Sequence, residues 1–170
     1  MDETPTDAPL LQDKVVIVTG AGAGIGREIA LQLAAQGACI VVNDVGVSLQ
    51  GEQEQIAAAD QVAAEITAHG GRAVANRSSV ALAEGAQGMV AQALEHYGRL
   101  DAVVNNAGIL RDGMFHKMTA EDFDAVLKVH LYGSFYLSRA AADPFRAQNG
   151  GCYVHMTSTA GLIGNVGQAN

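Results

Sequence analysis

Charged residues are scarce in this chain, and basic residues are the scarcest of them. Lysine and arginine number ten against eighteen aspartates and glutamates, which gives a formal net charge of −8 over 170 residues. The ten basic residues are scattered, so we expect no basic patch and no nucleic-acid partner. Long apolar runs are missing as well, since none approaches the ~20 residues that a bilayer-spanning helix needs. We therefore expect no membrane partner either.

The amino-terminal segment 1–10 carries acidic residues, threonines and two prolines. This is the opposite of the basic-then-apolar layout of a secretory signal, so we expect a disordered tail over 1–10 and a cytoplasmic protein. Cysteine is almost absent. The two that occur, Cys39 and Cys152, both lie in apolar runs. This pattern favours two buried thiols in a reducing compartment over a disulfide, and we expect no metal site.

A glycine-rich stretch, Thr19-Gly20-Ala21-Gly22-Ala23-Gly24-Ile25-Gly26, follows a buried apolar run at 14–18. After it, Ile25, Ile29 and Leu33 recur at the spacing of a helix. A glycine turn between a strand and a helix lets the backbone approach an anion, and the unpaired N–H groups of the first helical turn stabilise its charge. The glycines are spaced more widely than in G-x-G-x-x-G. The sequence predicts a phosphate-binding turn here.

Apolar runs and helical patterns alternate along the rest of the chain. The predicted strands lie at 14–18, 39–42, 72–75, 100–104 and 152–157. The predicted helices follow the glycine turn and lie at 56–69 (Ala59, Val62, Ala63 and Ile66 on one face), 82–97 and 119–148, the last bent near Gly133, with a loop at 45–55. Because each strand is continuously apolar, we expect an α/β fold with a doubly wound parallel sheet covered on both faces. Right-handed crossovers give the order 3-2-1-4-5, with a crevice at the carboxyl ends of strands 1 and 4.

Asp44 follows the second strand, 24 residues after Gly20. An acidic side chain at this place accepts hydrogen bonds from the adenosine ribose of a dinucleotide. The same carboxylate would repel a 2′-phosphate, by roughly 4 kcal/mol at ~4 Å and an effective dielectric near 20. We therefore predict NAD over NADP, although Asp44 could also be a turn residue before Gly46.

Three motifs in order resemble the short-chain dehydrogenase/reductase family: the glycine stretch, Asn105-Asn106-Ala107-Gly108, and Ser158 with the segment 164–170. The resemblance covers nearly the whole chain after residue 10. Within the family, the residues around Asp44 and those at 105–112 and 167–170 resemble the (3R)-hydroxyacyl-CoA dehydrogenase unit of peroxisomal multifunctional enzymes type 2, and also 3-oxoacyl-carrier-protein reductases. The resemblance implies a Rossmann-type dinucleotide-binding domain over 11–170 that lacks the family's last strands.

Carried over position by position, the resemblance implies a set of sites for NAD. Its cofactor-binding residues would be Gly20, Gly24, Ile25, Gly26, Asp44, Ser78, Ser79, Asn105, Ala107 and Gly108. Many members have aspartate where Ser78 stands, so adenine contacts would be weaker here. Asn106 could instead only tie strands together.

Two further residues match the family's catalytic positions. Ser158 would hydrogen-bond the substrate oxygen, with helix capping as the alternative. His130 stands where many members have the asparagine of a proton relay, and a structural role is its alternative.

The resemblance also implies a reaction: reversible hydride transfer between NAD and a secondary alcohol or ketone, with a 3-hydroxyacyl thioester as one candidate substrate. The family's Tyr-x-x-x-Lys begins thirteen positions after the serine, and here that position would be 171, just past Asn170. We therefore expect the 170-residue chain alone to be inactive. The alternatives are a non-catalytic dinucleotide-binding module and a fragment of a longer enzyme. An apolar face on the 119–148 helix predicts a homodimer or homotetramer.

Overall fold

The computed structural model describes residues 9–47 and 57–170, so most of the expected tail at 1–10 and of the expected loop at 45–55 lies outside it. The elements in chain order are β1 (Val15–Thr19), α1 (Gly24–Ala35), β2 (Cys39–Asn43), α2 (Ala58–Ala68), β3 (Arg72–Asn76), α3 (Ala83–Tyr97), β4 (Ala102–Asn105), the 3₁₀ turn η1 (Phe115–Lys117), α4 (Ala120–Leu127), the π-helical turn η2 (Lys128–Tyr132), α5 (Gly133–Ala147), β5 (Cys152–His155) and α6 (Thr159–Ile163). Each predicted strand and helix has a counterpart here.

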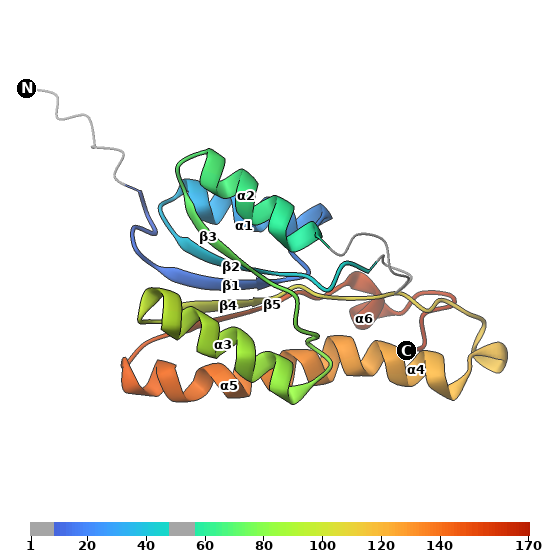
Figure 1. The fold of residues 1–170 in the computed structure, drawn as a ribbon. Coiled ribbons are helices and arrows are strands. Elements are labelled where there is room, and N and C mark those ends of the chain that lie inside the picture. Colours follow the sequence, from blue (N-terminus) through green and yellow to red (C-terminus); the bar gives the residue numbers. More distant parts are fainter. Residues whose placement is uncertain (1–8, 48–56) are drawn as a thin grey trace, which may run out of the picture.

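The strands form one parallel sheet in the order β3-β2-β1-β4-β5, as predicted from the crossovers. Val15 pairs with Cys39 at the start of β1, and Ala102 pairs with Cys152 at the start of β4. The carboxyl ends of all the strands therefore lie along one side of the sheet, which we call the ligand edge. The loops after β1, β2, β4 and β5 emerge there (Figure 1). Whatever these loops bind must lie at this edge.

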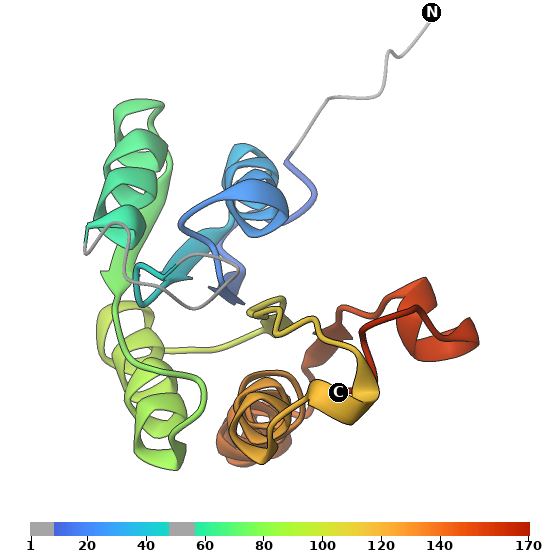
Figure 2. The same cartoon turned by 90° about the vertical axis from the view of Figure 1, so that its right-hand side faces the viewer.

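Helices cover the sheet from both sides, with α1 and α2 on one face and α3 and α5 on the other (Figure 2). One core cluster includes Val16, Val18, Ile40 and Ile66, and the other includes Ile17, Met89, Leu137 and Phe145. Neighbouring residues of β1 thus face opposite layers, which explains why the whole strand is apolar.

The face that α1 packs against the sheet is made of small residues. Gly26, Ala30 and Ala34 are its buried members, whereas Ile25 is 65% exposed. Ile29 and Leu33 are partly buried and pack against the same core, so of the residues with this spacing only Ile25 lies outside it. Glycine and alanine let the helix axis lie close to β1 and β2, which fixes the height of the glycine turn above the sheet edge.

The long helix after Thr119 is broken into α4 and α5 by the π-helical turn η2, directly before Gly133. Thr119 caps α4 by accepting a hydrogen bond from the Asp122 N–H (3.1 Å). A bend near Gly133 stays a prediction; what the structure shows before this residue is an irregular turn with i→i+5 hydrogen bonds, and this turn contains His130.

β5 forms an edge of the sheet, and its residues, Cys152–His155, are all exposed. This corrects one expectation, because the Cys152 thiol is exposed and only Cys39 is buried. Cys152 starts the edge strand, where one side of the sheet has no neighbouring strand among the described residues. Burial raises the pKa of the Cys39 thiol.

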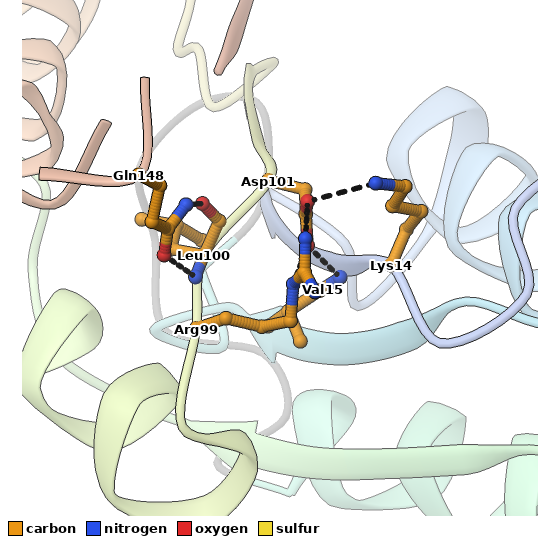
Figure 3. A network of polar contacts seen from close by, with 6 residues as sticks. All are labelled: Lys14, Val15, Arg99, Leu100, Asp101 and Gln148. Carbon is orange, nitrogen blue, oxygen red and sulfur yellow. Dashed lines mark hydrogen bonds and ion pairs between the residues drawn. The ribbon is translucent and has the colours of Figure 1, made fainter. Parts of the chain in front are cut away.

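A polar network fastens the amino ends of the strands, opposite the ligand edge (Figure 3). Asp101 accepts hydrogen bonds from the Val15 N–H (3.0 Å), Lys14 Nζ (3.2 Å) and Arg99 Nε (2.8 Å). Burial works to raise the pKa of Asp101, but Arg99, the Val15 N–H and Lys14 together outweigh it, so the pKa lies below its usual value. The side chain of Gln148 closes the same end by bonding the Leu100 N–H (3.1 Å) and C=O (2.7 Å).

Within residues 9–47 and 57–170, no helix combines the length and apolarity that crossing a membrane requires.

Candidate functional site

The glycine turn between β1 and α1 is packed so tightly that side chains are excluded from it. Gly20 and Gly24 have φ of +62° and +54°, a region that L-residues with a side chain rarely adopt. A Cβ on Gly22 would stand 2.6 Å from the Ala58 Cβ and 2.8 Å from the Asp44 carboxylate. A Cβ on Gly26 would collide with the Gly20 carbonyl oxygen. Close packing therefore keeps side chains out of positions 20, 22 and 26 of this turn.

The amino-terminal end of α1 has backbone N–H groups without a side-chain acceptor among the described residues. No side chain among the described residues caps it at Ala23, and its first turn carries no acidic residue. The N–H groups of the first turn are thus left for an external acceptor, and the helix dipole favours an anion there. This is the environment that a pyrophosphate requires.

Asp44 joins the end of β2 to the glycine turn. Its Oδ2 accepts the Gly22 N–H (2.8 Å) and its Oδ1 accepts the Gly46 N–H (2.7 Å). The carboxylate is therefore fixed in orientation at the sheet edge, beside the turn, where the sequence placed it. Each oxygen keeps a further lone pair for a ligand hydroxyl.

Thr19 connects the glycine turn to the loop after β4. Its Oγ1 donates to the Val104 carbonyl (3.2 Å) and accepts the N–H groups of Asn106 and Ala107 (3.0 Å each). Asn106 adds two more hydrogen bonds between the same segments, because its Nδ2 donates to the carbonyl oxygens of Thr19 (2.9 Å) and Gly20 (3.1 Å). The strand-tying role left open for Asn106 is thus the contact observed.

The predicted cofactor residues at the end of β4 and after it have different neighbours. The buried side chain of Asn105 turns toward α5 and β5, with Nδ2 3.4 Å from Ser138 Oγ and from His155 Nδ1. Ala107 lies under Gly20, since a Cβ on Gly20 would come within 2.9 Å of the Ala107 Cα. Gly108 lies against His130, whose Cε1 would be 2.6 Å from an added Cβ.

His130 supports this loop from η2. Its Nε2 lies 2.9 Å from the Ile109 carbonyl oxygen and 3.1 Å from the Ile109 nitrogen. Which of the two contacts is the hydrogen bond depends on the ring tautomer, and either one ties the ring to Ile109. The ring therefore holds the main chain directly after Gly108.

Ser78 and Ser79 follow β3 at the same edge. The Ser78 carbonyl accepts from Asn43 Nδ2 (2.8 Å), which also bonds Asn76 Oδ1 (2.9 Å). The Ser79 hydroxyl accepts the Ala81 N–H (3.2 Å) and shapes the turn into α3. These contacts place the pair at the edge, and its adenine contact stays a prediction.

Ser158 is exposed after β5 and caps the short helix α6, accepting the Ala160 N–H at 3.2 Å. The capping alternative is thus the contact seen, and the hydroxyl proton remains available to an outside acceptor. In register, His155 pairs with Asn105, so the loops carrying Ser158 and Gly108 leave the same edge of adjacent strands.

A family profile described as short chain dehydrogenase matches residues 14–170. The chain belongs to the short-chain dehydrogenase family. It is 56% identical over 162 residues to a Mycobacterium tuberculosis protein named as a short-chain type dehydrogenase/reductase, covering 95% of this chain and 57% of that protein. A crystal structure of a Mycobacterium avium short chain dehydrogenase superposes with a TM-score of 0.85 at 48% identity, covering 94% of this chain and 59% of that one.

The expected subgroup is confirmed by two further relatives of this short-chain dehydrogenase. Mouse peroxisomal multifunctional enzyme type 2 is 49% identical over 164 residues, which are 96% of this chain and 22% of that enzyme. A 3-oxoacyl-[acyl-carrier-protein] reductase of Synechocystis is 41% identical over 160 residues, which are 94% of this chain and 62% of that enzyme. The chain thus spans 62% or less of each of these proteins.

Sequence reasoning missed the residues that assemble the site without touching a ligand. Thr19, Asn43 and Asn76 are the clearest, because their side chains join the end of one strand to a neighbouring strand, loop or helix. A threonine or asparagine as the last residue of an apolar strand is the signal that could have found them, since a buried polar side chain needs partners.

Proposed function

We propose that this short-chain dehydrogenase is an NAD-dependent oxidoreductase that interconverts a secondary alcohol and a ketone. The observation that carries the proposal is the meeting of three features at one sheet edge: the uncapped start of α1, the Asp44 carboxylate and the loop at 105–108. Anion-binding N–H groups beside a ribose-binding carboxylate suit a dinucleotide, and membership of the family supports an oxidoreductase.

The described residues fit NAD because close packing keeps side chains out of positions 20, 22 and 26 of the turn. The N–H groups of Gly24, Ile25 and Gly26 would hold the pyrophosphate, with Gly20 giving it room, and Ala107 and Gly108 would line the cofactor. Asp44 would accept the ribose hydroxyls, with Ser78 and Ser79 beside the adenine. When bound, the nicotinamide supplies or accepts the hydride.

Ser158 and His130 would serve the reaction in different ways. The Ser158 hydroxyl, exposed at the ligand edge, would donate to the substrate oxygen and orient it. His130 would act as a positioning residue, because its Nε2 is engaged with Ile109 and is thereby kept from a substrate. The acid/base tyrosine that the resemblance puts at position 171 is part of the same proposal.

A 3-hydroxyacyl thioester is the substrate class we favour. The support is that similar proteins are named as a peroxisomal multifunctional enzyme type 2 and as a 3-oxoacyl-[acyl-carrier-protein] reductase. The test compares kcat/KM for a 3-hydroxyacyl thioester with kcat/KM for a simple secondary alcohol of equal reactivity that lacks the thioester. Equal kcat/KM for the two substrates would count against the assignment.

We also propose a homodimer or homotetramer working in the cytoplasm. Of the helix face that suggested assembly, Val126 is buried within the chain, but Leu131 and Phe135 are 61% and 60% exposed. Exposed apolar residues on one helix face fit a second copy. Light scattering that finds only monomer at micromolar concentration would refute the assembly, and fractionation of the source cells checks the location.

The test of the reaction is a Ser158→Ala variant of the full protein encoded by the gene. We expect kcat to fall by roughly two to four orders of magnitude with little change in NAD affinity. Thr67→Ala, at the far end of α2, is the control and should leave kcat unchanged. If NAD binds but no alcohol or ketone is turned over by the parent protein, the chain is a dinucleotide-binding module instead.

A further inference from the structure

Two segments that leave different strands are joined at the ligand edge. The Gly113 N–H donates to the Gly167 carbonyl (2.8 Å), and Asn170 Nδ2 donates to the Arg111 carbonyl (3.0 Å), across 59 residues of chain. In Figure 1 the stretch after β4 and the stretch after α6 emerge at the same end of the sheet. The pairing is antiparallel, because residue 111 meets residue 170 while residue 113 meets residue 167.

A side-chain pair stands between these two attachments. Gln168 Nε2 lies 3.2 Å and 3.1 Å from the two carboxylate oxygens of Asp112 and donates to them. The other end of the same amide is also held, since Gln168 Oε1 accepts from Asn165 Nδ2 (3.1 Å). The donor end of Gln168 is therefore directed at Asp112. We call residues 111–113 and 167–170 the clasp.

The clasp is anchored to the elements that carry the proposed site. Arg111 Nε lies 3.7 Å from Asp122 Oδ1, and Asp122 belongs to the capped start of α4. On the other side, Ile109 is held by His130, directly after the predicted cofactor loop. The segment 111–113 is thus held at its amino-terminal end by two elements, and the segment that follows Ser158 is fixed onto it.

The clasp adds nothing to the hydrophobic core. Among the described residues, neither core cluster contains a member from 110–125 or 156–170. Its bonds are polar and lie at the surface, where a hydrogen bond adds little to global stability. What they determine is the position of one loop relative to another.

We propose that Asp112 and Gln168 are positioning residues that set the place of the Ser158 loop relative to the cofactor loop at 105–108. The inference rests on the proposed function. Hydride transfer requires the substrate carbon to meet the cofactor while its oxygen meets Ser158, so the separation of the two loops is part of the catalytic geometry. A displacement of ~1 Å costs up to about 10²-fold in rate.

The test reverses the polarity of the pair in the full protein. Gln168→Glu puts two carboxylates face to face, and we expect kcat to fall roughly tenfold or more while KM for NAD stays within about twofold. Adding Asp112→Asn to it restores an amide donor opposite a carboxylate, and kcat should return to within about threefold of the parent. Gln87→Glu, an exposed change of the same charge on α3, is the control and should have no effect.

Amide hydrogen exchange of Gly113 gives a second readout that needs no activity. Exchange should speed up in Gln168→Glu and slow again in the reversed pair, because this N–H is bonded to Gly167. Faster exchange in Gln168→Glu with an unchanged kcat would overturn the positioning role alone. A kcat of the double variant as low as that of Gln168→Glu would do the same. An absence of turnover in the parent protein would instead overturn the proposed function, and this inference with it.

Discussion

Replacing Asp44 with alanine should change which nicotinamide dinucleotide the protein prefers, and the contacts of this carboxylate separate two effects of the change. The first effect is on the loops. Asp44→Ala leaves the N–H groups of Gly22 and Gly46 without their acceptor. A lost hydrogen bond to a charged group costs about 1.5–3 kcal/mol, less where water replaces it. This cost weakens NAD and NADP alike.

The second effect acts on one cofactor only. A 2′-phosphate placed ~4 Å from the carboxylate is opposed by roughly 4 kcal/mol at an effective dielectric near 20, before relaxation and screening. NAD has no such charge and loses only its ribose contacts with the carboxylate. The loop cost cancels in the ratio of the two dissociation constants, so this ratio reports the lost ribose contacts and the lost repulsion, both of which shift the preference toward NADP. If a third of the repulsion survives screening, the ratio shifts by about 1.4 kcal/mol, which is tenfold.

Calorimetric titration of NAD and NADP into the parent protein and Asp44→Ala measures this ratio. Asp143→Asn changes the net charge by the same amount on α5, where Asp143 pairs with Arg139 on the surface, and should leave the ratio alone. The shift should also shrink at high salt. A parent protein that binds NADP as tightly as NAD, or an Asp44→Ala ratio equal to the parent's, would refute the reasoning.

Three other perturbations test the fold beneath the site. Gly26→Ala should weaken NAD binding and destabilise the protein by about 1–3 kcal/mol in urea unfolding, because its Cβ collides with backbone, whereas Gly88→Ala, whose Cβ on α3 would meet only Ser78 Oγ at 3.9 Å, should be neutral or stabilising. Asp101→Asn should cost about 1–3 kcal/mol at neutral pH. Since the folded pKa of Asp101 is lowered, its stabilisation is present above the unfolded value and lost as pH falls through the folded one, so acid unfolding curves of variant and parent should converge. A thiol reagent should modify Cys152 at once and Cys39 only on unfolding; two fast thiols would contradict the burial of Cys39.

The sequence was sufficient for the order of the strands, because continuous apolar runs and right-handed crossovers leave few arrangements. It was also sufficient for the buried face of α2, where Ala59, Val62 and Ile66 point at the sheet. It did not predict the buried face of α1. There the fully buried positions are held by glycine and alanine, while Ile29 and Leu33 are only partly buried and Ile25 is exposed.

In the candidate site, too, the sequence predicted what depends on local conformation and did not predict what depends on tertiary contacts. Asp44 and the glycines could be found because their roles depend on their own conformation and on the strand they follow. The direction of the Asn105 side chain and the pairing of Asp112 with Gln168 could not, since both depend on which loops meet in space. Ser158 was placed correctly at the edge, and its capping of α6 was recognised only as an alternative.

The π-helical turn at 128–132 gives the long helix a fixed phase. An α-helix advances about 100° per residue, so inserting one residue into α5 directly after this turn would rotate α4 and the turn by that angle while the rest of α5 stayed packed on the core. His130 would swing away from Ile109, and Asp122 away from Arg111. Length variation of a single residue here would therefore uncouple the helix from both loops of the ligand edge at once, whereas substitutions that keep the length would spare the alignment.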